Sequence, residues 1–187
     1  AFNNIKKDKN TFYPFLIAVV TLSGLFYMLC AIWKELGTGK FYGAWQMEII
    51  LQIGVVITGI LCAGIVFYTN GFLMKRRTKE LGLYNILGME KKHIGYVLSL
   101  EISIIALTGL VLGMFFGILF AKLLYMVFMK MLGVKQLMEF HISLETIGIT
   151  ICLFGGVFLV DIFSNYIRLL FLKPVDMLQS ASRGEKE

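Results

Sequence analysis

Four long apolar runs, separated by short polar segments, dominate the hydropathy pattern of this chain. They cover about residues 12–33, 49–74, 94–129 and 144–172. A helix rises about 1.5 Å per residue, so about 20 residues cross the roughly 30 Å hydrocarbon core of a bilayer. Each run is long enough for one crossing. The pattern therefore predicts an all-α integral membrane protein with four transmembrane helices.

Charged residues inside the last two runs limit how each run sits in the bilayer. In the third run, the section between Glu101 and Lys122 is uncharged and about 30 Å long. Both charges are therefore expected near opposite interfaces, where a charge costs least. The fourth run has only about 22 Å before Asp161, so its helix must include Asp161 and continue toward Ile167.

Composition and charge support the same class of protein. Hydrophobic residues make up 58% of the 187 positions and charged residues only 16%, too little charge to cover a soluble domain of this size. The net charge of +6 is gathered in clusters beside the apolar runs, which indicates membrane topology rather than nucleic-acid binding. Lys and Arg are most frequent before the first run, between the second and third, and after the fourth. The positive-inside rule then predicts that both termini are cytoplasmic.

Residues 75–93, which we call the basic island, separate the second and third runs. The island reads KRRTKELGLYNILGMEKKH and holds six of the eighteen Lys and Arg residues. Its apolar residues Leu83, Ile86 and Leu87 have helical spacing, and Gly88 is a natural stop. The pattern predicts an amphipathic helix over about residues 76–88 at the cytoplasmic interface. Such a helix could anchor the chain to anionic lipid or dock a soluble partner.

Small residues recur at every fourth position on the third run and again on the fourth: Gly109, Gly113 and Gly117, and Gly148, Cys152 and Gly156. Such stripes let another helix backbone approach closely. Ordinary helix packing and a sliding surface used during transport are both open interpretations.

Two further polar groups lie within the runs. Glu101 is expected to pair with a lysine or arginine of the island, and a structural role or proton coupling are the alternatives. Asp161, Asn165 and Arg168 fall at i, i+4 and i+7, which makes one polar stripe suited to hydrogen bonds between helices.

No pattern of catalytic or metal-binding residues emerges. Cys30, Cys62 and Cys152 lie inside apolar runs without zinc-ligand spacing, and His93 and His141 are isolated. We expect no catalytic residue, no metal site and no bound cofactor in this chain.

The island and the run after it resemble a known family. The stretch RTKELGL at residues 77–83, the Leu87-Gly88-Met89 step, the basic residues before Ile94 and the Glu101 that opens a glycine-rich span are similar to the FtsX-like permease signature. The amino-acid sequence around the island resembles the bacitracin-export (BceB-like) branch of this family. The resemblance is to the N-terminal four-span half of those permeases. The resemblance is strong over the last three runs and weak over the first.

The resemblance implies the permease subunit of an ABC transporter, with the island as the coupling helix. It implies an ATPase-coupling set of Arg77, Glu80, Leu81, Gly82, Leu83, Leu87, Gly88 and Met89. A second cytoplasmic contact is implied at Pro174, Asp176 and Leu178. ATP and Mg would bind to separate ATP-binding subunits, two per transporter.

The branch implies resistance to, or sensing of, antimicrobial peptides at the bacterial plasma membrane. Its members have ten spans and a large extracellular domain, so the remaining half of the permease and a membrane histidine kinase are further implied partners. Two other functions stay open: a four-span proton-coupled exporter with Glu101 as the carrier, and a non-transporting scaffold that relays ATPase motion.

Overall fold

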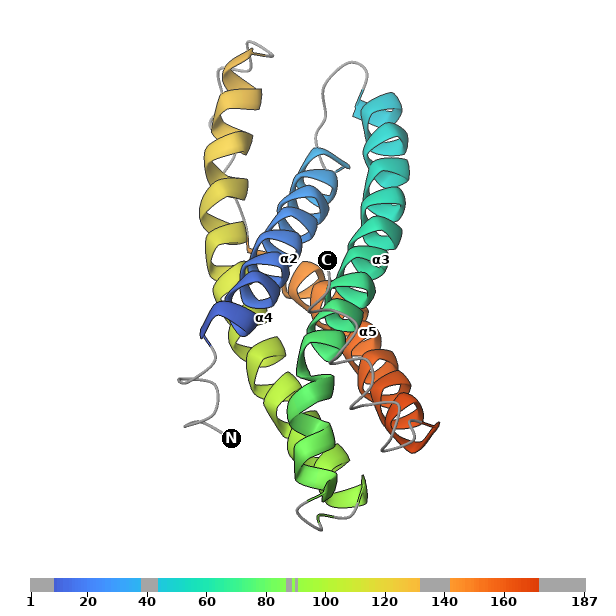
Figure 1. Cartoon of the computed structure of the whole chain (residues 1–187). Coiled ribbons are helices and arrows are strands. Elements are labelled where there is room, and N and C mark those ends of the chain that lie inside the picture. Colours follow the sequence, from blue (N-terminus) through green and yellow to red (C-terminus); the bar gives the residue numbers. More distant parts are fainter. Residues whose placement is uncertain (1–8, 38–43, 87–88, 90, 132–141, 172–187) are drawn as a thin grey trace, which may run out of the picture.

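The computed structural model describes residues 9–37, 44–86, 89, 91–131 and 142–171 (Figure 1). The described residues are almost all helical and contain no strand. The helices are α2 (Lys9–Gly37), α3 (Ala44–Ile86), α4 (Lys91–Met131) and α5 (Leu144–Phe171). All four are long and apolar enough to cross a membrane. The prediction of an all-α protein with four transmembrane helices is confirmed.

Two of the helices are much longer than a bilayer requires. α3 has 43 residues and α4 has 41, which corresponds to about 60 Å each. Figure 1 shows them converging below α2, at the end where the basic island connects them. Residues 76–86 are helical, and they are the last turns of α3 rather than a separate helix. Residues 87 and 88 of the predicted coupling helix lie outside the described residues.

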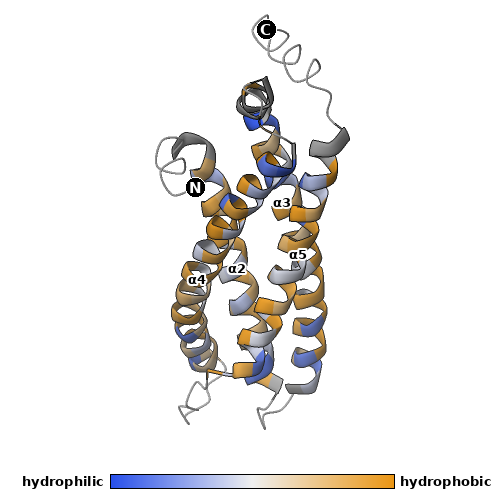
Figure 2. Cartoon of the chain, turned by 90° about the horizontal axis from the view of Figure 1, so that it is seen from below, coloured by the Kyte–Doolittle hydropathy of each residue, from blue (hydrophilic) through white to orange (hydrophobic). Residues whose placement is uncertain are grey.

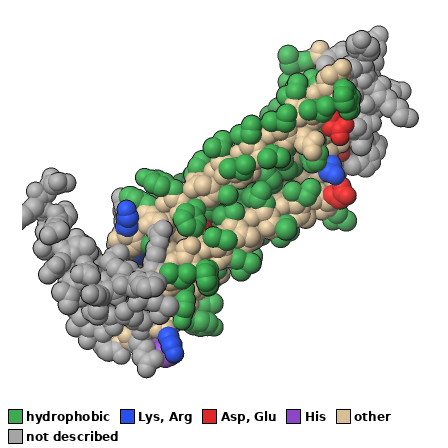
Figure 3. Space-filling model, turned by 90° about the vertical axis from the view of Figure 1, so that its right-hand side faces the viewer, with side chains coloured by type: hydrophobic (Ala, Val, Ile, Leu, Met, Phe, Trp, Pro, Cys, Tyr) green, Lys and Arg blue, Asp and Glu red, His purple; other side chains and the backbone are tan. Residues whose placement is uncertain are grey.

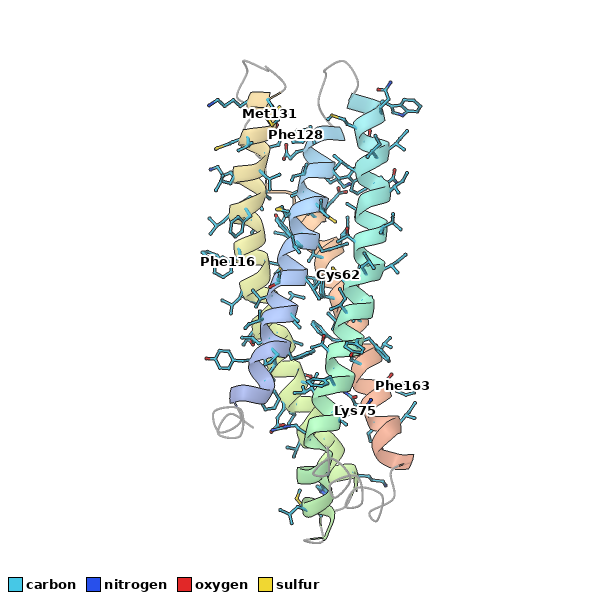
Figure 4. The ribbon with its side chains drawn as sticks, turned by 45° about the horizontal axis from the view of Figure 1, so that its top comes forward. Cys62, Lys75, Phe116, Phe128, Met131 and Phe163 are labelled. Atoms are coloured by element: carbon cyan, nitrogen blue, oxygen red, sulfur yellow. The ribbon has the colours of Figure 1, made fainter. Side chains whose placement is uncertain are left out.

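The helices expose apolar side chains along most of their length. Figure 3 shows a band of hydrophobic side chains, with Lys, Arg, Asp and Glu gathered toward the two ends of the face in view. Figure 2 shows the same dominance of hydrophobic residues along the ribbons. Phe116 of α4 and Phe163 of α5 point away from the bundle (Figure 4). An apolar surface of this extent fits contact with lipid.

α2 is the central packing partner of the bundle, and its most extensive contact is with α4. The two helices meet at glycines. A Cβ added to Gly113 would lie 1.8 Å from Ser23 Oγ and 2.7 Å from the carbonyl oxygen of Val20. A Cβ added to Gly117 would lie 2.9 Å from the carbonyl oxygen of Gly24. Only glycine permits this approach, so the glycine stripe of α4 sets the distance between the two helices.

α3 and α5 pack on the other side of α2. The thiol of Cys62 lies 3.7 Å from the carbonyl oxygen of Leu22 and can donate a weak hydrogen bond to it. The ring of Phe26 meets that of Phe154 edge-on, with 6.1 Å between centroids. Aromatic contacts thus bring α5 against the same part of α2 that faces α3.

The small residues of α5 behave differently from those of α4. Gly148 and Gly156 are exposed, with nothing within 4 Å of an added Cβ, and Cys152 is exposed as well. No described helix packs against this stripe, although its spacing matches that of Gly109, Gly113 and Gly117. The described residues thus give it no packing role.

We expect Gly113→Ala to destabilise the bundle, because the new methyl group would overlap Ser23 Oγ and a backbone oxygen that cannot move away. Overpacking of this kind costs about 1–3 kcal/mol. Thermal unfolding in one detergent would measure the loss. Gly148→Ala, in open space on α5, is the matched control and should not lower the melting temperature, because alanine favours a helix more than glycine does. Equal melting temperatures for the two variants would contradict the assigned role of Gly113.

Candidate coupling site at the island end

The island begins on a face of α3 that is already buried in the span. Asn70, Leu73, Met74 and Arg77 are all buried, and their spacing of three and four residues places them on one side of the helix. Arg77 is 4% exposed although it belongs to the most basic segment of the chain. The buried face of the span therefore continues into the island, where it includes the charged side chain of Arg77.

Arg77 is held by groups from two other helices. Its Nη1 donates a hydrogen bond to Oε2 of Glu101 on α4, and the pair forms a buried salt bridge. On α2, the ring of Phe12 lies 4.2 Å from the Arg77 guanidinium carbon, in cation–π contact. Glu101 is 1% exposed. A buried guanidinium without such partners would be very costly, so these contacts explain how the charge is tolerated. We call Arg77, Glu101 and Phe12 the clamp.

Apolar side chains seal the α3–α4 side of the clamp. Met74 of α3 packs with Ile94, Leu98 and Ile102 of α4, and Ile162 of α5 packs against this cluster. The contacts begin in the first turn of α4, directly after the island. They keep water from the ion pair and give the two ends of the island fixed neighbours.

The polar stripe of α5 also faces inward at this end of the bundle. Asp161 is fully buried and Asn165 is 3% exposed, four residues further on the same face. Arg168 is helical, but the position of its side chain is outside the described part of the structure. Buried polar side chains from α3, α4 and α5 therefore occur in the half of the bundle next to the island.

The other predicted coupling residues are described only in part. Leu83 and Met89 are exposed, at 55% and 39%. For three residues, only the helical backbone is described: Glu80, Leu81 and Gly82. Five others lie outside the described residues: Leu87, Gly88, Pro174, Asp176 and Leu178. The structure thus brings together Arg77 and Glu101 from the predicted set.

Sequence reasoning missed two members of this region, Phe12 and Asn70. Asn70 had a usable signal, because it is one of two carboxamide residues in the second apolar run and precedes Arg77 by two helical turns. Phe12 had none, since it is one of sixteen phenylalanines. Only the three-dimensional arrangement distinguishes it.

We expect Arg77→Met to destabilise the protein by about 3–5 kcal/mol, because it leaves the Glu101 carboxylate buried without the guanidinium. The double variant Arg77→Met/Glu101→Met should lose less than Arg77→Met alone. Lys34→Met is the control. Lys34 forms a salt bridge with Glu145 at the opposite end of the bundle, with 2.7 Å between the charged atoms. The two side chains are 34% and 71% exposed. Loss of such an exposed pair costs about 1 kcal/mol or less. Thermal unfolding distinguishes these cases, and equal losses for Arg77→Met and Lys34→Met would contradict the clamp.

Comparison with known proteins identifies the family. The model described as FtsX-like permease C-terminal matches residues 52–174. The Bacitracin export permease protein BceB of Bacillus subtilis is 25% identical over 175 residues, which is 94% of this chain and 27% of that protein. Its namesake from Halalkalibacterium halodurans is 23% identical, over 94% of this chain and 26% of that protein. The Uncharacterized ABC transporter permease YvcS of Bacillus subtilis is 26% identical over 170 residues, 90% of this chain and 26% of that protein.

The matches cover most of this chain but only part of each relative. The chain spans about a quarter of the length of these relatives. The family model covers most of α3 and all described residues of α4 and α5, where the sequence resemblance is strongest. The predicted resemblance is confirmed: this chain belongs to the FtsX-like permease family of ABC transporter permeases and is similar to bacitracin export permeases.

Proposed function

We propose that this chain transmits the motion of separate ATP-binding subunits into the membrane through the basic island. In this proposal two such subunits bind ATP and Mg, and the chain contributes no catalytic residue. The island and both termini are cytoplasmic. The clamp is the single observation that carries the proposal, because it joins the island rigidly to more than one helix.

The continuity of α3 supports transmission of force. The helix runs from Ala44 to Ile86 without interruption, so its apolar span and the first part of the island are one rod. Arg77 lies where the span becomes the island, and Glu101 ties it to α4. A displacement of the island would therefore move α3 and α4 together. A flexible connection would absorb the same displacement.

The exposed end of the island suits a docking partner. Leu83 and Met89 are large apolar side chains exposed in a segment rich in charge. Burial of such residues is typical of protein interfaces. In our proposal the ATP-binding subunit covers them, together with Glu80 and Gly82. Pro174, Asp176 and Leu178 form the second contact.

The names of the relatives support a role in resistance to, or sensing of, antimicrobial peptides. Two of them are bacitracin export permeases. We propose that this chain is the N-terminal four-span half of such a permease in a bacterial plasma membrane. Peptide recognition would then lie in the remaining part of the permease, and a membrane histidine kinase would be a signalling partner.

The environment of Glu101 favours coupling over proton-driven export. Glu101 is 1% exposed and occupied by its ion pair with Arg77. A proton carrier must exchange protons with water on each side of the membrane, and the packing of the described residues around Glu101 provides no such contact. A scaffold that relays ATPase motion without transport would use the same clamp, and measurement of peptide resistance separates it from a transporter.

We expect Leu83→Asp to weaken binding of the ATP-binding subunit by at least tenfold, because a buried carboxylate without a partner costs more than about 1.4 kcal/mol. Co-purification and peptide resistance should both fall, while membrane insertion and melting temperature stay the same. Leu144→Asp is the matched control, since Leu144 is 84% exposed at the opposite end of the bundle. Normal subunit binding by Leu83→Asp would refute the docking role.

Labelling of single cysteines would test the orientation. In a variant whose three natural cysteines are serine, Met89→Cys should react with a membrane-impermeant maleimide only after the cells are permeabilised. Leu144→Cys should react in intact cells. Labelling of Met89→Cys from outside would show that no cytoplasmic ATPase can touch the island.

A further inference from the structure

A groove runs along the outer face of α3 toward the basic island. It has a volume of about 320 Å³ and is lined by Gly64, Phe67, Tyr68, Gly71, Phe72 and Lys75. Its two glycines lie seven residues apart, three aromatic residues line it beside them, and Lys75 is the lining residue nearest the island. Gly64 is exposed, and nothing lies within 4 Å of a Cβ added there. All its lining residues belong to α3, and it shares Gly64 and Phe67 with the groove between α3 and α5.

The cation at its end distinguishes this groove from three others. Grooves of about 390, 440 and 310 Å³ lie between α2 and α4, α3 and α5, and α4 and α5, and no charged residue lines any of them. Lys75 is exposed, and within the described parts of the chain no carboxylate forms an ion pair with it. The α3 groove therefore combines an apolar channel with a cation available to an anionic group.

The dimensions of the groove match one leaflet of a bilayer. Lys75 is the last residue of the apolar span of α3, so its ammonium group is at the level of the lipid headgroups. From Lys75 to Gly64 the helix extends about 16 Å toward the membrane centre. Half of the roughly 30 Å hydrocarbon core is about 15 Å. An acyl chain that starts beside Lys75 would thus reach the end of the groove near the middle of the bilayer.

We propose that this groove binds one anionic phospholipid, with its phosphate against Lys75 and an acyl chain along Gly64 and Gly71. The negative headgroup complements the ammonium group, and the apolar channel accepts the chain. A packed transmembrane helix would also fit beside glycines, but an anionic lipid supplies in addition a negative group at the level of Lys75. Lipid contact at this site is independent of the coupling role proposed above.

Native mass spectrometry of the intact permease would test the site. The protein is titrated in detergent with phosphatidylglycerol and, separately, with phosphatidylcholine of the same acyl chains. The wild-type protein should bind phosphatidylglycerol more tightly. Lys75→Gln should weaken phosphatidylglycerol binding about fivefold, the factor expected for loss of one basic side chain near a membrane surface. Binding of phosphatidylcholine should stay unchanged.

A second variant tests the channel rather than the charge. Gly64→Leu should weaken binding of both lipids, because the new side chain occupies space at the Gly64 end of the groove. Gly148→Leu, at an equally open glycine on α5, should have no effect. A melting temperature equal to that of the wild-type protein would show that each variant is folded.

Lys92→Gln is the control for non-specific electrostatic attraction between basic residues and the lipid headgroup. Lys92 is exposed at the same end of the bundle but does not line the groove. An equal loss for Lys75→Gln and Lys92→Gln would show diffuse attraction and overturn the site. Unchanged lipid binding in Lys75→Gln would overturn it as well. If Gly64→Leu binds both lipids normally but the permease fails to assemble, a transmembrane helix occupies the groove. That result would also overturn the lipid site.

Discussion

The ion pair of Arg77 and Glu101 is the constraint on which the island end of this protein depends. α3 and α4 are consecutive helices, yet their mutual contact is the least extensive of the six helix pairs. Among the described residues, the ion pair and the apolar cluster around Met74 therefore supply the main direct contacts between these two long helices. A buried pair adds little net stability compared with an apolar contact, but its separation leaves a bare charge in the protein interior. The pair thus restricts geometry more than it increases stability.

Packing around α2 complements this constraint. In lipid, helices gain little from burial of apolar surface against each other, so close van der Waals contact decides which faces meet. The glycines of α4 supply that contact in the middle of the bundle, where Gly113 and Gly117 touch the backbone of α2. Phe12 then connects the first turns of α2 to Arg77. α2 is consequently bound to α4 in the centre and to α3 beside the island.

The sequence predicted the fold class well, because backbone groups in hydrocarbon must be satisfied within helices and apolar length alone then reveals the spans. Helix ends were harder to predict. Hydropathy detects where apolar residues stop, but α3 continues as a helix into charged residues, up to Ile86. Charge ends a membrane span without ending a helix, so the spans predicted for α2, α3 and α4 are shorter than the helices.

The site was only partly predictable for a related reason. The cost of a charge in the membrane indicated that Glu101 needs a basic partner, but the island offers six. Arg77 meets it because it continues the buried face of Asn70 and Met74, and that face is set by tertiary packing. The glycine stripes were ambiguous in the same way. Gly113 and Gly148 have equivalent spacing in the sequence, yet of the two only Gly113 has another described helix beside it.

The unbroken length of α3 has a mechanical consequence. With Arg77 as a fulcrum, the arm toward Ile86 is about 14 Å long and the arm toward Ala44 about 50 Å. A rigid lever with these arms enlarges a movement at its short end more than threefold at its far end. A shift of about 2 Å at Ile86 would become roughly 7 Å at Ala44.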